Sequence, residues 1–527
     1  MASAEWRELS TAMVRGRPTQ VWRRRPKHVL DLFELSVGKP EHDLIVQGQR
    51  RISHEAFRTG VETAAAMLIR RGVSPGDRVL IVLYNSPEFW LIQWAAWRIG
   101  AVPVLGNRWW SERDLSDALE RVEPAMLATD LPYVDDGRAV VHVTPQDIAS
   151  WWAMPFPDTV APDPRSSADE DDVAIIVFTA GSTGAPKGVQ LTHRNLVWTQ
   201  QTIHSMRGGK PSAVIHPSEQ KVALTTTPLF HNGSMVAAIG TMIDGGRVVM
   251  LAGKFDPEQA MRLIETEGVT SWSAVPTMFR RILQHPSLPN YDLSSLVAPA
   301  SGGSIVSRQF LHELRGGLPR AGEGFSSGYG MTEMSFLTMV SGDQLDARPG
   351  AVGMPIPGAE VRIDDPDSSG EGEIVGRSGA LMAGYLGTKE QPIDDDGWYH
   401  TGDLGRIDAD GFLYVTGRLK DMVIRGGENI SCAHVETAIL AHDDVLEAAV
   451  IGFPDDDLGE ALAAIVCRRA GSTLSQEELA AFVKHRLAYF ERPSRWQIRY
   501  EPLPVLPTGK VDKLLLTKEF CAALAIA

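Results

Sequence analysis

The stretch FTAGSTGAPKG occupies residues 178–188 and continues an apolar run at 173–178. Its glycines let the backbone approach an anion closely, and Thr179, Ser182 and Thr183 can donate hydroxyl hydrogens. Lys187 adds a positive charge. Because the apolar run has the length of a strand, we expect these groups at the carboxyl end of a sheet, where open α/β sheets bind ligands. The stretch therefore predicts a phosphate-binding loop.

This stretch does not fit the Walker A pattern GxxxxGK[ST]. Five residues after Gly181 comes Pro186, and a glycine follows Lys187 where Walker A has serine or threonine. The sequence therefore favours a phosphate loop of another design, and the structural alternative is a glycine-rich turn that binds nothing.

Apolar runs and helical patterns alternate along most of the chain. Residues 78–106 predict a strand, a helix and a second strand, with Asn85 or Ser86 as N-cap and Pro87 in the first helical turn. Further strand-length apolar runs lie at 222–226, 247–251, 270–275 and 296–298. This alternation predicts an α/β fold with mostly parallel sheets covered by helices.

The pattern of predicted elements changes towards the C-terminus. Short β runs and a hairpin turn at Asp410-Gly411 predict a β-rich, barrel-like part, and an α+β pattern with a capping box at Ser475 and Glu478 follows. No flexible linker separates the β-rich part from the α+β part, so movement of one against the other requires a short hinge. The expected divisions are a large N-terminal domain at 1–417 with its β-rich part at about 350–417, a hinge at 418–421 and a small, mobile C-terminal domain at 422–527.

Composition restricts the partners. The chain has 527 residues, three cysteines and a formal net charge of -15, which disfavours a nucleic-acid partner. No apolar run is long enough for a membrane span, no signal peptide is apparent, and the few cysteines fit a reducing cytoplasm. The basic run Arg23–Arg25 is expected on a solvated surface or as a cap on the fold.

Six further stretches follow the loop: PLFHNG (228–233), SGGS (301–304), GYGMTE (328–333), YHTGDLG (399–405), GRLKDMVIRGGENI (417–430) and PTGKVDK (507–513). With TAGSTGAPKGV at 179–189, these seven ordered motifs resemble those of the adenylate-forming superfamily, which includes acyl- and aryl-CoA synthetases, luciferases and adenylation domains of peptide synthetases. The resemblance implies a reaction in two halves. A carboxylate attacks the α-phosphate of ATP, with Mg²⁺, to give an acyl-adenylate and pyrophosphate, and a thiol, usually that of CoA, then displaces AMP.

The resemblance also assigns roles to nucleotide-binding residues. Thr332 is expected at the α-phosphate, Glu333 at Mg²⁺, and Tyr329 against the adenine. Asp403 can accept both ribose hydroxyls, joined by Arg418. The complete nucleotide-binding set is Thr179, Ala180, Gly181, Ser182, Thr183, Gly184, Lys187, Ser301, Gly302, Gly303, Gly328, Tyr329, Gly330, Met331, Asp403 and Arg418.

The resemblance places a mobile cation on the C-terminal domain. Lys510 is expected to bridge the substrate carboxylate and the α-phosphate during the first half-reaction, and Lys420 matches the hinge position. After rotation, the RGGENI loop would face the site and pass CoA; its CoA-binding residues are Arg425, Gly426, Gly427 and Glu428. The expected catalytic set is Lys510, Thr332, Glu333, Lys420 and His231.

The resemblance also assigns an acyl pocket. His231 matches an aromatic gate that acts by its bulk and not as an acid or base. PLFHNG lacks the acidic residue with which amino-acid-activating relatives bind an amine, so we expect a bulky apolar or aromatic carboxylic acid. The expected pocket residues are His231, Asn232, Met235, Val275, Pro276, Gly302, Gly330 and Met331.

One residue departs from the family pattern. The family commonly has serine or threonine where Ala180 stands, and a lost hydrogen bond to a phosphate would cost about 1.5–3 kcal/mol, or roughly 10- to 150-fold in adenylation rate. Two interpretations stay open: tolerated variation, or an enzyme that mainly completes thioesterification on an acyl-adenylate from a partner enzyme.

Two more hypotheses stay open, one about which thiol accepts the acyl group and one about the class of reaction. A carrier protein could accept the acyl group in place of CoA. GFSSG at 324–328 also fits the pattern of a serine hydrolase, with Ser326 as the nucleophile. A homodimer likewise stays open.

Overall fold

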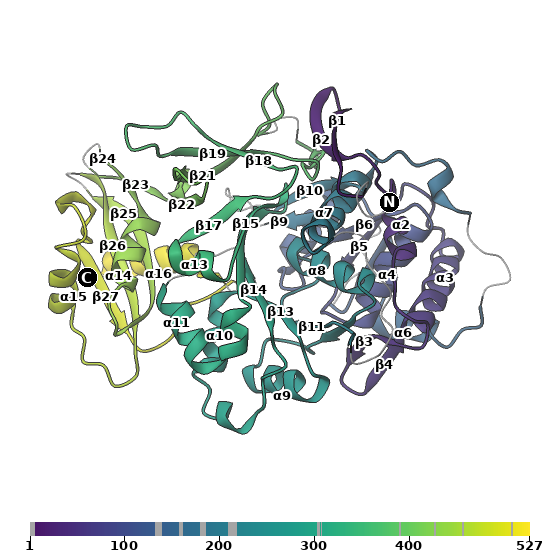
Figure 1. Ribbon diagram of the computed structural model, residues 1–527, viewed down its shortest axis with the longest axis horizontal. Helices are drawn as coiled ribbons and strands as arrows, with labels where there is room; N and C mark the ends of the chain where they lie inside the picture. Colours follow the sequence, from purple (N-terminus) through teal and green to yellow (C-terminus); the bar gives the residue numbers. More distant parts are fainter. Residues whose placement is uncertain are drawn as a thin grey trace.

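A computed structural model describes residues 6–131, 140–156, 162–179, 186–208, 219–302, 306, 308–388, 392–425, 428–455, 458–506 and 510–526. Figure 1 shows a large N-terminal part and a smaller C-terminal part, drawn in yellow-green to yellow at one end of the molecule. Among these residues no helix is both long and apolar enough to cross a bilayer. Cys432, Cys467 and Cys521 are free thiols.

The first sheet of the large part is mostly parallel. Strands β9, β6, β5, β7 and β8 run parallel, whereas β10 and β20 pair antiparallel at the edge next to β9. The complete strand order is β20 (Gly384–Tyr385), β10 (Lys187–Thr192), β9 (Val173–Thr179), β6 (Val102–Leu105), β5 (Arg78–Val82), β7 (Met126–Thr129) and β8 (Val141–Val143).

The predicted strand–helix–strand unit at 78–106 is confirmed as β5, α4 (Pro87–Arg98) and β6. Of the two N-cap candidates, Ser86 caps the helix by accepting a hydrogen bond from the Phe89 amide. The Asn85 side chain instead bonds the carbonyl of Thr227 and the amide of Leu229. It therefore fixes the loop that carries the PLFHNG motif.

The second sheet begins parallel and continues antiparallel. Strands β3, β12, β11, β13, β14 and β15 are neighbours and run parallel. The β-rich region predicted near 350–417 extends this sheet on the far side of β15, through the antiparallel strand β16. The strand order is β18 (Glu360–Asp364), β19 (Gly372–Arg377), β21 (Tyr399–Ile407), β22 (Leu413–Arg418), β17 (Ala351–Pro355), β16 (Ser335–Ser341), β15 (Ser326–Met331), β14 (Ala298–Gly302), β13 (Ser271–Ser273), β11 (Val222–Thr225), β12 (Arg247–Met250), β3 (Asp43–Gln47) and β4 (Arg50–Ser53). The predicted turn at Asp410-Gly411 connects β21 to β22.

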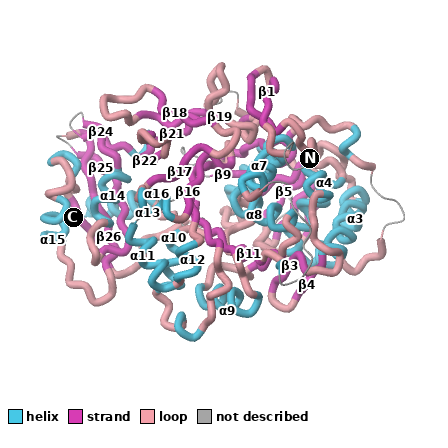
Figure 2. Tube along the Cα trace, viewed as in Figure 1, coloured by secondary structure: helices cyan, strands magenta, loops and turns pink. Residues whose placement is uncertain are grey.

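Two helices fill the space between the sheets. Helices α7 (His193–Met206) and α8 (Asn232–Ile243) are buried on nearly all sides and share one apolar core with both sheets (Figure 2). The other helices of the large part are α2 (Val29–Glu34), α3 (His54–Arg70), α5 (Glu112–Val122), α6 (Pro145–Trp151), α9 (Pro257–Glu267), α10 (Pro276–Leu283), α11 (Arg308–Gly317), α12 (Pro319–Glu323) and α13 (Asp343–Ala347).

The C-terminal part has the predicted α+β order. The predicted capping box of Ser475 and Glu478 begins α15, which ends at Val483. One hairpin, β23–β24, occupies the stretch that was expected to be a loop. The elements are β23 (Met422–Arg425), β24 (Glu428–Ser431), α14 (Cys432–Leu440), β25 (Val445–Asp455), β26 (Gly459–Arg468), α15 (Gln476–Val483), β27 (Arg495–Arg499) and α16 (Lys513–Ile526).

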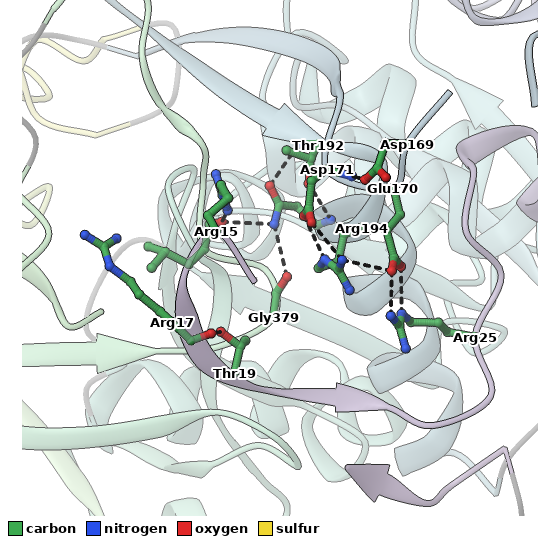
Figure 3. Close-up of polar contacts among 12 residues, drawn as sticks. Arg15, Arg17, Thr19, Arg25, Asp169, Glu170, Asp171, Thr192, Arg194 and Gly379 are labelled. Carbon is green, nitrogen blue, oxygen red and sulfur yellow. Dashed lines mark hydrogen bonds and ion pairs between the residues drawn. The ribbon is translucent and has the colours of Figure 1, made fainter. Parts of the chain in front are cut away.

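The N-terminal hairpin of β1 (Leu9–Val14) and β2 (Arg17–Trp22) leads to Arg25, which joins a network of partly buried ion pairs (Figure 3). Arg25 bonds Glu170 through two nitrogens at 2.8 and 2.6 Å. Arg194, at the start of α7, bonds both oxygens of Asp171 at 2.8 Å and lies 2.9 Å from Glu170. The solvated position expected for the basic run is therefore found at Arg23 but not at Arg25. The network fixes the segment that leads into β9 and its loop.

We predict that Arg194→Leu lowers the free energy of unfolding by about 2–4 kcal/mol, because Asp171 loses both hydrogen bonds from its arginine and Glu170 keeps only Arg25 as its cation. Arg194 lowers the pKa of Asp171, so the contribution is present above the ordinary carboxyl pKa and is lost as the pH falls through the lowered value. Urea unfolding at pH 7 measures it. The control Arg23→Leu removes only an exposed pair with Glu8, and equal losses in both variants would refute the prediction.

Candidate active site

The order of parallel strands brings three of the motifs, together with Val275, to one edge of the second sheet. Strands β11, β13, β14 and β15 run parallel, so their carboxyl ends meet. His231 follows β11, Val275 follows β13, Gly302 ends β14, and the turn with Thr332 and Glu333 follows β15. Residues spread over more than a hundred positions thereby line a common edge.

A tyrosine, an aspartate and an arginine form the first polar cluster. The Tyr329 hydroxyl donates to Oδ2 of Asp403 at 2.7 Å, and Nε of Arg418 lies 2.8 Å from Oδ1. Asp403 and Arg418 are directly paired across β21 and β22. Burial, with the Asp403 charge as a further cause, raises the pKa of Tyr329 well above its ordinary value, so the hydroxyl remains a donor. Each Asp403 oxygen keeps a second lone pair, so the carboxylate can still accept a diol.

A second polar cluster surrounds Glu333. Its buried carboxylate accepts a hydrogen bond of 2.8 Å from the Tyr385 hydroxyl, which lies 3.0 Å from the Tyr399 hydroxyl. Burial and the Glu333 charge raise the pKa of both tyrosines, so both stay protonated. Lys187 Nζ lies 4.8 Å from the centre of the Tyr385 ring. Tyr385, which the sequence did not single out, thus contacts both the lysine of the phosphate loop and the expected metal ligand.

The donor set around Glu333 fits Mg²⁺. Within the described part of the chain no group of three or more histidine, cysteine or acidic side chains converges. Mg²⁺ bound with a nucleotide takes one or two carboxylates and completes its coordination with phosphate oxygens and water. A single buried carboxylate held by a tyrosine hydroxyl is therefore compatible with that ion.

Part of the expected nucleotide set lies outside the described residues, and so do both CoA-loop glycines. The flanking Thr179 and Lys187 are paired across β9 and β10, so the phosphate stretch closes the hairpin between these strands. The residues outside are Ala180, Gly181, Ser182, Thr183, Gly184, Gly303, Gly426 and Gly427; the side chains of Lys420 and Glu428 are likewise not described.

Two positions of β15 require glycine because the backbone of β16 lies very close to them. A Cβ at Gly330 would lie 2.0 Å from the carbonyl oxygen of Ser335, and one at Gly328 would lie 2.6 Å from that of Thr338. A Cβ at Gly302 would meet nothing within 4 Å. The first two glycines therefore let β15 and β16 pack, whereas Gly302 adjoins open space.

His231 is a partly exposed, neutral histidine. Desolvation lowers its pKa to about 4, with a smaller effect from Lys510, so the ring is uncharged at neutral pH. Its Nε2 and the hydroxyl of Ser301 are buried polar atoms without a partner among the described residues. Its ring lies 4.5 Å from that of Phe230, which packs edge-on at 5.4 Å from Trp109. These contacts suit the expected steric role.

Helix α8 opens to solvent at two small residues. Gly233 and Ala237 are exposed, although they lie in a helix whose other residues are buried. They are four residues apart and so lie on one helix face. Asn232 and Met235, expected in the acyl pocket, are buried, Met235 completely. Of the other expected pocket residues, Val275 is buried, and Pro276, Gly302, Gly330 and Met331 are partly exposed.

The C-terminal part brings Lys510 to this edge. The pKa of Lys510 is lowered by desolvation from the surrounding protein and by repulsion from Arg418, whereas Asp403 raises it. The residue still reaches solvent. Lys510 also acts on His231, so one lysine lies within electrostatic reach of both the polar cluster and the histidine.

Not every expected residue joins the site. Arg425 donates to the carbonyls of Phe490 and Arg492 at 2.8 and 3.2 Å and so belongs to the C-terminal part in this arrangement. Ser326 begins β15, which continues as a strand paired with β16. A nucleophile elbow needs a strand, a sharp turn and a helix, so the serine hydrolase hypothesis is wrong.

Two family models match the chain. The model for AMP-binding enzymes covers residues 33–386, and the model for their C-terminal domain covers residues 434–510. The 3-[(3aS,4S,7aS)-7a-methyl-1,5-dioxo-octahydro-1H-inden-4-yl]propanoyl:CoA ligase of Rhodococcus jostii (strain RHA1) is 33% identical over 508 residues, covering 90% of this chain and 95% of the relative. The feruloyl-CoA synthase of an Amycolatopsis species is 32% identical, covering 91% and 96%.

Solved structures agree with these relatives. ATP-bound MatB from Rhodopseudomonas palustris superposes with a TM-score of 0.81 at 28% identity, covering 93% of this chain and 98% of that one. The o-succinylbenzoate CoA synthetase MenE from Bacillus subtilis, in complex with its acyl-adenylate intermediate, has a TM-score of 0.78 at 27% identity, covering 92% and 97%. With seven motifs in the family's order and both family models matched, the chain belongs to the adenylate-forming superfamily of AMP-binding enzymes and is an AMP-forming acid–CoA ligase.

Proposed function

We propose that this enzyme activates a bulky apolar or aromatic carboxylic acid as its acyl-adenylate and transfers the acyl group to CoA. The observation that carries the proposal is the position of Lys510, near Asp403 and His231 at the edge where the motifs meet. A cation supplied by the C-terminal part can neutralise charge that develops between carboxylate and α-phosphate.

In the first half-reaction, Asp403 and Arg418 bind the ribose, and the Tyr329 ring lies against the adenine. Thr332 donates a hydrogen bond to the α-phosphate, and Lys187 with its loop binds the outer phosphates. Glu333, oriented by Tyr385, would hold Mg²⁺, which supplies neutralising charge to the phosphates when bound. The acid's carboxylate attacks the α-phosphate, and pyrophosphate leaves.

In the second half-reaction, the C-terminal part turns about the hinge at 418–421 and withdraws Lys510. Arg425, Gly426, Gly427 and Glu428 then face the site and pass the pantetheine arm. The CoA sulfur attacks the acyl carbonyl, and AMP leaves. His231, neutral and packed against Phe230, separates the acyl pocket from the thiol path by its bulk.

The exposed face of α8 supports a bulky acid. Gly233 and Ala237 are exposed along one helix face, and no acidic side chain follows His231 in the motif to bind an amine. Two relatives at 32–33% identity are named for a bicyclic propanoate and for ferulate, which are both bulky acids. The same class is therefore the first choice for this chain.

We expect a panel of aromatic, fatty and polycyclic acids with ATP, Mg²⁺ and CoA to give acyl-CoA and AMP from the bulky members, scored by the mass of the acyl-CoA.

Lys510→Ala should lower pyrophosphate exchange by about 100-fold or more, because charge neutralisation is lost, yet retain CoA ligation of a synthetic acyl-adenylate. Lys518→Ala, an exposed lysine of α16, is the matched control. If neither half-reaction occurs with any acid, the proposal is refuted. Transfer only to a phosphopantetheinyl carrier protein would favour a carrier-loading enzyme.

A second function rests on Ala180. If the missing hydroxyl is needed, the enzyme mainly completes thioesterification on an adenylate supplied by a partner enzyme. Ala180→Ser should then raise pyrophosphate exchange by roughly 10- to 150-fold and leave ligation of synthetic acyl-adenylate unchanged. Robust exchange by the unmodified protein, and no gain in the variant, would refute this second function.

We predict that Tyr385→Phe lowers pyrophosphate exchange by about 5- to 10-fold and raises the Mg²⁺ concentration for half-maximal rate. The change removes the donor to Glu333 but keeps the ring beside Lys187. Exchange measured across a Mg²⁺ titration checks both effects. Tyr414→Phe, which removes a hydroxyl bonded to Asp408 at the surface, is the control, and an unchanged Mg²⁺ requirement in Tyr385→Phe would contradict the prediction.

A further inference from the structure

A cluster of charged residues joins the two parts of the chain at α10 and α11. Glu313 on α11 lies 2.6 Å from Nη2 of Arg469, which follows β26 in the C-terminal part. The other oxygen of Glu313 lies 3.3 Å from Nε of Arg280 on α10. Arg280 in turn donates to the carbonyl of Leu446 in β25 at 3.1 Å. Figure 1 shows α11 of the large part beside the C-terminal part.

Each part contributes one fixed partner to this cluster. Arg469 is held within the C-terminal part, because its Nε donates to the carbonyl of Asp443 at 2.6 Å. Arg280 stands over the Phe310 ring of the large part at 5.7 Å. Glu313 is about one-fifth exposed, and it is the member that contacts an arginine from each side. Loss of its charge would leave two neighbouring arginines without their shared anion.

We infer that Glu313 is a positioning residue for adenylation: by joining Arg280 to Arg469 it holds the C-terminal part in the arrangement that places Lys510 at the active site. The inference rests on the proposed function, since it assigns Glu313 to one half-reaction only. Thioesterification requires that Lys510 withdraw, so it does not need this contact. Partly exposed ion pairs contribute little free energy, so they favour the arrangement with Lys510 at the site only weakly over the withdrawn one. The expected effect on pyrophosphate exchange is therefore about 3- to 10-fold.

The test compares both half-reactions in Glu313→Gln. Pyrophosphate exchange should fall about 3- to 10-fold, while CoA ligation of synthetic acyl-adenylate stays within about twofold of the unmodified enzyme or rises. Arg469→Gln should give the same split from the other side, and the double variant should be no worse than either single one. The control is Asp346→Asn on α13, which breaks an ion pair with Arg315. Arg315 lies on α11 like Glu313, but this ion pair does not cross to the C-terminal part.

An assay without substrate separates this inference from the proposed function. Arg418 and Lys420 are trypsin sites at the hinge, and we expect faster cleavage there in Glu313→Gln and Arg469→Gln than in Asp346→Asn. If the unmodified enzyme performs neither half-reaction, the proposed function fails and the cleavage rates still decide the inference. Equal cleavage in all variants, equal losses in both half-reactions, or additive losses in the double variant would overturn it.

Discussion

The hydrogen bond from Tyr385 to Glu333 joins the two sheets of the large part at the place where the reaction is expected. Tyr385 lies on β20 of the first sheet, and Glu333 follows β15 of the second. A buried carboxylate is costly unless a donor compensates it. The sheets must therefore pack so that the tyrosine reaches the glutamate. Lys187, on the neighbouring strand β10 of the first sheet, lies beside the same ring. Tyr385 therefore contacts both Lys187, which ends the proposed phosphate loop, and Glu333, the proposed metal ligand.

The sequence predicted the residues whose position depends on strand order. His231, Glu333 and Asp403 each follow or lie in a strand with a clear pattern, and parallel strands bring their ends together. Tyr385 was missed because its role depends on how one sheet packs against the other, which no local pattern records. The packing of Arg25 is a similar case: a basic run normally predicts solvated side chains, but Glu170 arrives from 145 residues away.

Helix α8 shows what composition leaves undecided. Met235 was expected in an acyl pocket because methionine adapts to irregular shapes, and it lies fully buried in the core shared by the two sheets. Gly233 and Ala237 are the exposed positions of α8. Residue 235 is two positions from each of them, and residues two apart do not share a helix face. Which residues of α8 face solvent could be determined only once the buried side of the helix was known.

The charges around Lys510 explain why a separate contact between the two parts is useful. Bringing this lysine to the site costs desolvation, and Arg418 repels it, while Asp403 attracts it. The phosphates of ATP would add the missing negative charge, so the arrangement is favoured most while the triphosphate is bound. In the proposed reaction, loss of pyrophosphate would remove much of that charge and would shift the balance towards withdrawal of the lysine. The ion pairs of Glu313 lie on a different part of the interface and do not involve Lys510, so they can stabilise the arrangement before the nucleotide arrives. Because these pairs are partly exposed, they are weak enough to break when the lysine must leave.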